Sequence, residues 1–170
     1  MLTAREWLFG AALIFLVVLL IKVRPVARGR REIGAALKAA RERARAAETN
    51  RELAEALCDA ATIAATKARR STMAAGLLVR AMRAEPAWDK PIELAVRLLA
   101  KRHPRLAEKL LWRRMSHLHW GAEHRAALVA VARGLRGIYR HALRDRAKAE
   151  AMLRLSERLE NGFAEERAIH

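Results

Sequence analysis

The stretch "AMRAEPAWDKPIELAVRLLAKRHPRLAEKLL", residues 81–111, holds three of the four prolines of the 170-residue chain. Between these prolines, apolar residues recur at helical spacing. Proline ends a helix or lies in its first turn. We therefore expect Pro86 to end one helix, Pro91 to lie in the first turn of the next, and Pro104 to begin a third. Short connections between amphipathic helices predict antiparallel helical hairpins.

The composition favours the same fold class over the whole chain. Hydrophobic residues make up 53% of the sequence but aromatic residues only 5%, so alanine and leucine, both strong helix formers, carry the apolar content. The sequence therefore predicts an all-α protein. The formal net charge is +16, which leaves nucleic acid and anionic lipid open as partners. A GC-rich genome would produce the same excess of arginine and alanine.

On either side of the proline-rich stretch, the apolar pattern predicts further helices. We expect a helix in residues 31–50, a second that Asn50 caps, and a third that Ser71 or Thr72 caps. Residues 121–162 contain no proline and predict two helices with a bend near Asp145, although one long helix is not excluded. "NG" at 161–162 is a candidate carboxyl-terminal stop.

The amino-terminal residues predict a membrane anchor. Residues 7–21 carry no charge, and the apolar stretch to residue 27 is long enough for a short membrane-spanning helix. We prefer a retained anchor to a cleaved signal peptide, because the flank beyond it lacks a small-x-small site and is rich in arginine. Positive residues stay cytoplasmic, so we expect the amino terminus outside and the body in the cytoplasm. The residues expected to meet anionic lipid headgroups are Lys22, Arg24, Arg28, Arg30 and Arg31.

These observations divide the chain into four parts: a transmembrane anchor at 1–27, a basic juxtamembrane segment with the first soluble helix at 28–50, helical hairpins at 51–120, and carboxyl-terminal helices with a tail at 121–170. The single cysteine, Cys58, excludes an internal disulfide and a cysteine-based zinc site. Its place on an apolar helix face predicts a packed, inert thiol.

Part of this chain resembles the tetratricopeptide repeat, a helical hairpin of about 34 residues. Residues 55–87 carry the family's small, large, small and proline positions at Ala74, Leu78, Ala81 and Pro86. The next unit, from Trp88, shows Leu94, Ala95, Leu98, Ala107 and Leu111. Cys58 and Pro91 depart from the family pattern, since they stand where its tryptophan is usual. The resemblance implies a TPR-like α-solenoid, and membrane-tethered members generally act as assembly scaffolds.

In the register of that family, the first helix of each hairpin lines an inner surface that binds a helix or an extended segment of a partner protein. The alternative is that the same residues pack against neighbouring helices of this chain. The candidate partner-binding residues are Asp59, Ile63, Thr66, Lys67, Asp89, Ile92, Val96 and Leu99.

The sequence nominates no reaction, no cofactor and no metal. It contains no glycine-rich phosphate loop, no His-Glu-x-x-His and no Gly-x-Ser-x-Gly, so we expect a protein that is not an enzyme. The residues His117, His119, Glu123 and His124 are potential ligands, but Gly121 interrupts them. We therefore expect these histidines to be solvated in a turn.

Two further functions remain open at this point. Arginines from 97 to 146, together with Trp112, Trp120 and Tyr139, form a candidate nucleic-acid or anionic-lipid surface. Interspersed acids and the several angles of these arginines favour solvated or ion-paired side chains instead. The other possibility is a structural subunit of a membrane protein complex.

Overall fold

The computed structural model describes residue 15 and residues 32–168, with side chains described up to Asn161. Within this part the chain is all-α and contains no strand, as the composition predicts. A helix covers residues 32–46. The elements that follow are α2 (Asn50–Thr66), α3 (Ser71–Ala84), α4 (Lys90–Leu99), α5 (Pro104–His117), the 3₁₀ turn η1 (Ala122–His124), α6 (Arg125–Gly137), the π-helical turn η2 (Ile138–Leu143) and α7 (Arg146–Ala168).

The prolines lie where the sequence places them. Pro86 follows the end of α3 at Ala84, Pro91 occupies the first turn of α4, and Pro104 is the first residue of α5. Because a proline lacks the backbone N–H, it is tolerated only at such positions. The stretch 81–111 therefore forms the end of α3, the whole of α4 and the beginning of α5.

Two of the predicted caps are wrong. Thr49, not Asn50, caps α2: its Oγ1 accepts a hydrogen bond from Glu52 N at 3.1 Å, and Glu52 Oε2 accepts one from Thr49 N at 3.4 Å. Neither Ser71 nor Thr72 caps α3, which already begins at Ser71 without a side-chain cap.

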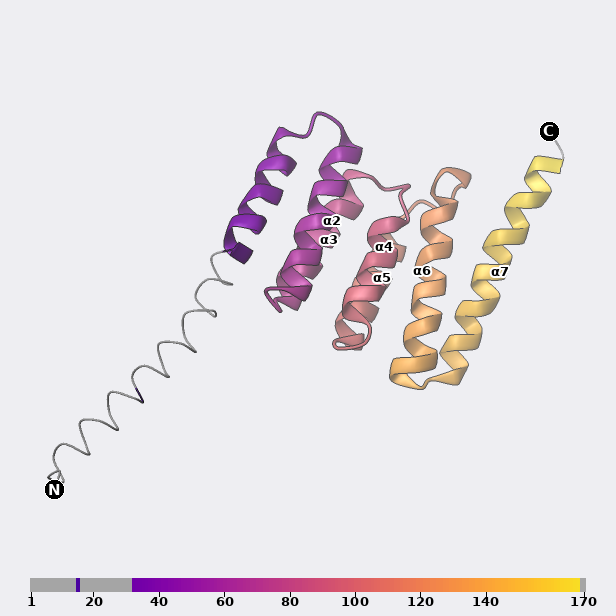
Figure 1. Cartoon of the computed structure of the whole chain (residues 1–170). Helices are drawn as coiled ribbons and strands as arrows, with labels where there is room; N and C mark the ends of the chain where they lie inside the picture. Colours follow the sequence, from indigo (N-terminus) through magenta and orange to yellow (C-terminus); the bar gives the residue numbers. More distant parts are fainter. Residues whose placement is uncertain (1–14, 16–31, 169–170) are drawn as a thin grey trace, which may run out of the picture.

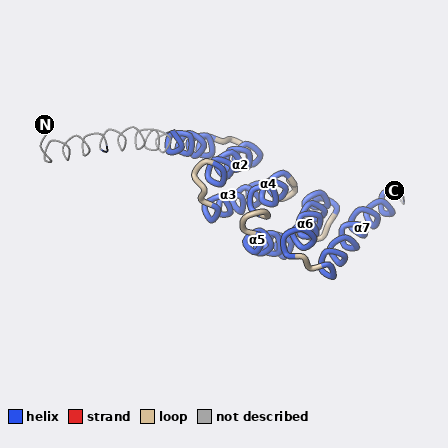
Figure 2. The backbone as a smooth tube through the Cα atoms, turned by 60° about the horizontal axis from the view of Figure 1, so that its bottom comes forward, coloured by secondary structure: helices blue, strands red, loops and turns tan. Residues whose placement is uncertain are grey.

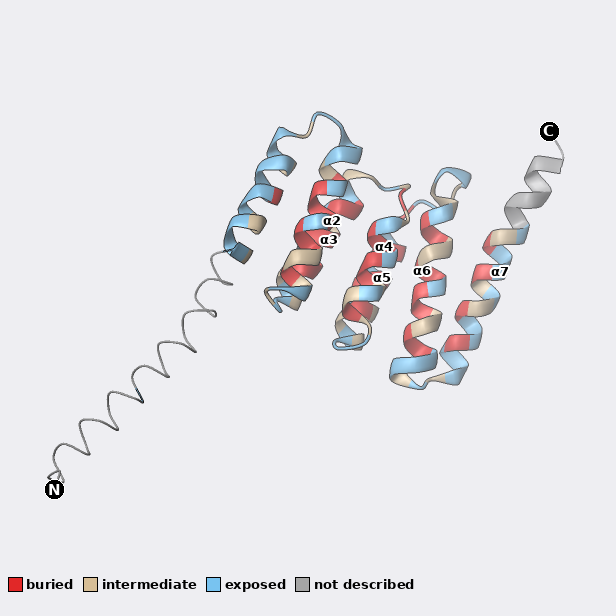
Figure 3. Ribbon diagram, in the orientation of Figure 1, coloured by how far each residue is buried: buried red, intermediate tan, exposed pale blue. Residues whose placement is uncertain are grey.

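The helices lie in two layers (Figures 1 and 2). α2, α4 and α6 lie side by side in one layer, and α3 and α5 lie next to each other in the other. α7 packs along α6. The interior between these layers is rich in alanine, and Ala54, Ala61, Ala64, Ala74 and Ala81 are fully buried (Figure 3). Small side chains let α2 and α3 approach each other closely along their length.

The helix at 32–46 is held less firmly than the others. Ala40 is its only fully buried side chain, and Leu37 and Ala44 are partly buried against the core. Across to α2, Arg43 Nη1 forms an ion pair of 2.8 Å with Asp59 Oδ2, and both of these side chains are exposed. An exposed ion pair contributes little to stability.

The carboxyl-terminal part forms two helices with a break near Asp145, as the sequence predicts. α6 widens into the π-helical turn, which ends at Arg144 in the left-handed region (φ 54°). The predicted stop at residues 161–162 is wrong, because α7 continues to Ala168. Asparagine and glycine weaken a helix by only about 1 kcal/mol or less each.

No helix among the described residues is long and apolar enough to cross a membrane. The anchor predicted at 1–27 lies outside the described residues, apart from Phe15, which is helical and exposed.

Candidate functional site

Two adjoining hollows form a groove along the α2–α4–α6 layer. One, of about 700 Å³, lies between α2 and α4, and the other, of about 590 Å³, lies between α4 and α6 and reaches Glu160 of α7. Asp89, Glu93 and Arg97 line both hollows. The groove therefore runs across α4 from one neighbouring helix to the next.

The groove differs in charge from the rest of this basic protein. Five acidic and four basic side chains line it: Glu55, Asp59, Asp89, Glu93 and Glu160 against Lys90, Arg97, Arg125 and Arg133. Apolar side chains gather on the α4–α6 side, where Val96, Ala126, Val129 and Ala130 line the hollow. The groove thus offers acidic groups mainly between α2 and α4, and an apolar surface between α4 and α6.

Several acids of the groove already have partners within the chain. Glu55 Oε1 accepts a hydrogen bond of 3.2 Å from Arg51 Nε, and Glu160 Oε1 accepts one of 3.0 Å from Arg133 Nη2. Glu93, by contrast, is exposed, and its side-chain carboxylate makes no hydrogen bond or ion pair with the described residues. Glu93 is therefore an acid of the groove that can meet a ligand without breaking a contact.

Trp88 supports the groove between α2 and α4. It is 8% exposed, and the Arg51 guanidinium lies 3.6 Å from the centroid of its rings. Lys90 Nζ lies 5.4 Å from the same centroid. Because Arg51 belongs to α2, its cation–π contact with Trp88 helps to hold the α3–α4 connection against α2, whereas Lys90 is a local contact from the start of α4.

The eight residues predicted to bind a partner do not all reach the groove. Asp59, Asp89 and Val96 line it. Ile92 and Leu99 are fully buried and belong to the core. Ile63 is partly buried against the core, and Thr66 and Lys67 are exposed at the end of α2. The five residues predicted to meet lipid headgroups, Lys22, Arg24, Arg28, Arg30 and Arg31, lie outside the described residues.

A pattern in the sequence could have found the acidic side of the groove. Glu55 and Asp59 are one helical turn apart, and Asp89 and Glu93 stand 34 positions further on with the same spacing. Residues four apart share one face of a helix. Two such pairs on neighbouring helices of one layer therefore face the same surface.

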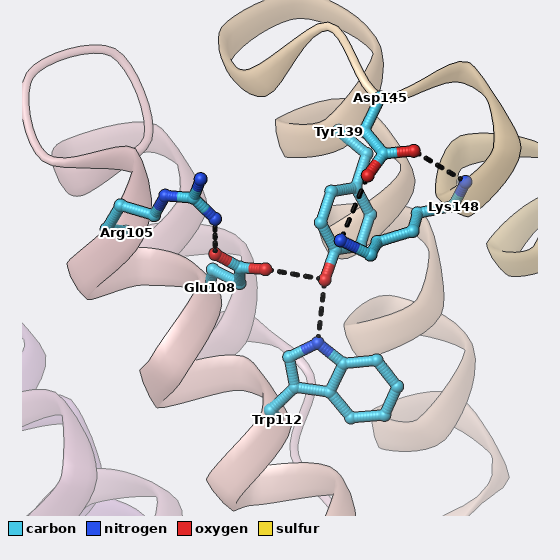
Figure 4. A network of polar contacts seen from close by, with 6 residues as sticks. All are labelled: Arg105, Glu108, Trp112, Tyr139, Asp145 and Lys148. Atoms are coloured by element: carbon cyan, nitrogen blue, oxygen red, sulfur yellow. Dashed lines mark hydrogen bonds and ion pairs between the residues drawn. The ribbon is translucent and has the colours of Figure 1, made fainter.

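A second polar cluster joins α5 to the π-helical turn and to the start of α7 (Figure 4). The Tyr139 hydroxyl donates to Glu108 Oε1 at 2.7 Å and accepts from Trp112 Nε1 at 2.8 Å. Arg105 Nη1 lies 3.1 Å from Glu108 Oε2, and Lys148 Nζ lies 2.9 Å from Asp145 Oδ2. The hydrogen bond from Tyr139 lowers the pKa of Glu108, and burial raises the pKa of Tyr139. The hydrogen bonds of Tyr139 thus hold the π-helical turn against α5, and Lys148 Nζ, 5.4 Å from the centroid of the Tyr139 ring, brings the start of α7 to the same cluster.

The histidine cluster does not form a site in this part of the chain. His117 ends α5, His119 lies in the following turn, and Glu123 and His124 belong to η1. No group of three or more metal-ligating side chains comes together among the described residues.

Several of the arginines and aromatic residues considered for nucleic-acid binding make contacts within the fold instead. Tyr139 is 1% exposed, so its ring cannot stack on a base, whereas Trp112 and Trp120 are exposed. Arg105 and Arg133 form ion pairs, and Arg114 is buried.

Comparison with known proteins gives no family model, no curated protein and no solved structure that matches this chain.

Proposed function

We propose that this protein is a membrane-tethered scaffold that holds a segment of a partner protein in the groove of α2, α4 and α6. The observation that carries the proposal is the groove itself, since it is lined by slightly more acids than bases in a chain of net charge +16. A polyanion would meet its acids, whereas a protein segment can complement both its acidic and its apolar parts.

The proposed repeat is TPR-like. α2 and α3 form one pair and α4 and α5 the next, and α4 packs on both helices of the pair before it. The acid pairs at 55/59 and 89/93 recur after 34 residues, which is the length of one tetratricopeptide repeat. In repeats of this kind, stacking neighbours bury a continuous core and leave the first helices to form a binding face.

The groove suits an extended or helical segment that carries basic and apolar residues. Basic groups would lie between α2 and α4, near Asp89 and Glu93, and apolar groups would contact Val96 and Val129 between α4 and α6. Such a segment would bind through a few apolar anchors, and its charges would fix its direction along the groove.

The anchor at residues 1–27 is part of this proposal. It would place the groove at the cytoplasmic face of the membrane, because the basic residues follow the apolar stretch. Fusion of alkaline phosphatase to the carboxyl terminus tests the orientation, and phosphatase activity there would contradict it. If the mature protein appeared in the soluble fraction without its first residues, the tether would be wrong.

Affinity purification of the full chain in an uncharged detergent tests the groove. The purification is run with and without nuclease on the unchanged protein, on Glu93→Arg and on Glu150→Arg. Both substitutions reverse one exposed acid, but Glu150 lies on α7 outside the groove. We expect nuclease-resistant protein partners that Glu93→Arg loses and Glu150→Arg keeps.

Two results would contradict the proposal. Partners that disappear after nuclease treatment would favour the nucleic-acid alternative. Partners that bind Glu93→Arg as well as the unchanged chain would show that the groove is not their binding site.

A further inference from the structure

A smaller hollow opens in the other layer of helices, between α3 and α5. It has a volume of about 130 Å³ and is lined by Val79, Met82, Arg83, Leu110, Arg113, Arg114 and His117. Three arginines and a histidine therefore line it, and no carboxylate does. This balance is the opposite of the one in the α2–α4–α6 groove.

Arg114 is the unusual member of this set. Its side chain lies in the interior, with the residue 8% exposed, and Nη2 donates a hydrogen bond of 2.7 Å to the carbonyl oxygen of Pro86. Its Nε is buried without a hydrogen-bond partner, and Arg114 forms no ion pair with the described residues. A buried cation is costly unless a counter-charge is close. Burial accordingly lowers the pKa of Arg114.

The fold accounts for only part of this arrangement. α3 and α5 both end near the hollow, and the carbonyl end of a helix favours a nearby cation. The bond to Pro86 satisfies one nitrogen of Arg114. Arg83 and Arg113 are exposed at the hollow and make no hydrogen bond or ion pair through their side chains with the described residues. Arg83 and Arg113 are thus free to point away from the hollow, yet both line it next to the buried Arg114.

We propose that this hollow between α3 and α5 binds a phosphate-type dianion. Guanidinium groups match the oxygens of phosphate in pairs of charge-assisted hydrogen bonds. The hollow has a volume of about 130 Å³, which is enough to admit one phosphate group. The ligand is inorganic phosphate or the phosphomonoester headgroup of an anionic lipid, and both offer the same dianion.

Phosphate titration of the full chain in uncharged detergent tests the site, with isothermal calorimetry at constant ionic strength. The test variant is Arg83→Gln combined with Arg113→Gln, which leaves Arg114 and its bond to Pro86 in place. The matched control is Arg154→Gln combined with Arg158→Gln, two exposed arginines of α7. It removes the same charge from a surface that does not line the hollow.

We expect saturable binding of phosphate at one site, weakened at least about tenfold in the Arg83/Arg113 variant and unchanged in the control. A tenfold change corresponds to about 1.4 kcal/mol, less than one strong charge-assisted hydrogen bond. Melting without phosphate is expected to be the same for all three proteins, which separates a lost ligand from a damaged fold. Absence of saturable binding, or equal binding in the two variants, overturns the proposal.

A second arm identifies the source of the phosphate group. The full chain is reconstituted in vesicles of phosphatidylcholine alone or with added phosphatidic acid, and the phosphate affinity is measured again. If phosphatidic acid weakens phosphate binding in the unchanged chain, the site takes a lipid headgroup. If the affinity stays the same, the site takes a soluble phosphate. The site is independent of the α2–α4–α6 groove, so Glu93→Arg is expected to leave phosphate binding unchanged.

Discussion

Gly134 is a position where α6 passes close to α4 and α5. A Cβ built on Gly134 would lie 2.7 Å from Val96 Cγ2 and 3.1 Å from Leu111 Cδ1. Carbon atoms pack best at about 3.5–4.0 Å, so Gly134→Ala forces Val96 or α6 itself to move. Val96 moves with difficulty, because valine in a helix has one strongly preferred rotamer.

The sign of the effect follows from two opposing terms. Alanine stabilises a helix interior by about 1 kcal/mol relative to glycine, whereas overpacking a filled site costs about 2 kcal/mol, within a usual range of about 1–3. We therefore expect Gly134→Ala to lower the free energy of unfolding by about 1 kcal/mol. Gly76, in the interior of α3, is exposed and has nothing within 4 Å of the added methyl. Gly76→Ala is expected to raise the free energy of unfolding by about 1 kcal/mol.

The assay is urea denaturation of the full chain in uncharged detergent, followed by circular dichroism at a helix wavelength. The two glycine variants should differ by about 2 kcal/mol. A double-mutant cycle with Val96→Ala identifies the cause: if the clash is with Val96, the double variant is more stable than the two single changes predict. If Gly134→Ala were as stabilising as Gly76→Ala, the close approach of α6 to α4 would be refuted.

Three further experiments, two with substitutions and one with a thiol reagent, test other contacts. Tyr139→Phe removes the hydrogen bonds that Tyr139 makes with Glu108 and Trp112, and we expect a loss of about 1–2 kcal/mol in urea denaturation. The lowered pKa of Glu108 contributes stability at neutral pH that is lost as the pH falls below the ordinary glutamate pKa of about 4.3; this acid dependence should be weaker in Tyr139→Phe, and an identical pH profile would contradict it. Burial raises the pKa of Cys58 to about 11, so a thiol reagent at pH 8 should label it only after denaturation; rapid labelling of the folded chain would show that α2 is not packed as described. Thr49→Ala removes the cap of α2 and should cost about 1 kcal/mol, whereas Thr66→Ala, at the exposed carboxyl end of α2, serves as the control with little effect.

The prolines made the hairpins predictable, because a missing N–H and a fixed φ act on the residue itself and require no knowledge of its neighbours. The break near Asp145 could be predicted only in part. The sequence indicates that a helix ends there, but the π-helical turn of residues 138–143 depends on how Tyr139 reaches α5. Contacts of this kind are set by tertiary packing.

The residues that line the groove were harder to predict for a related reason. Helical periodicity identifies a face of a helix, but it does not say which of two faces is covered. α4 packs against α2, α3, α5 and α6. Ile92 and Leu99 are therefore buried in the core, whereas Glu93 lines the groove. Capping also depends on one residue: Thr49 and Asn50 are both good caps, and Glu52 at the third helical position selects Thr49.

The helix at 32–46 has a mechanical consequence. Any pull on the chain from the side of its amino terminus reaches this helix before it reaches α2. One fully buried alanine, two partly buried side chains and one exposed ion pair to α2 anchor it, so we expect it to detach at a lower load than the hairpins behind it. A pull from that side is therefore expected to detach this helix while α2 and the hairpins behind it stay folded.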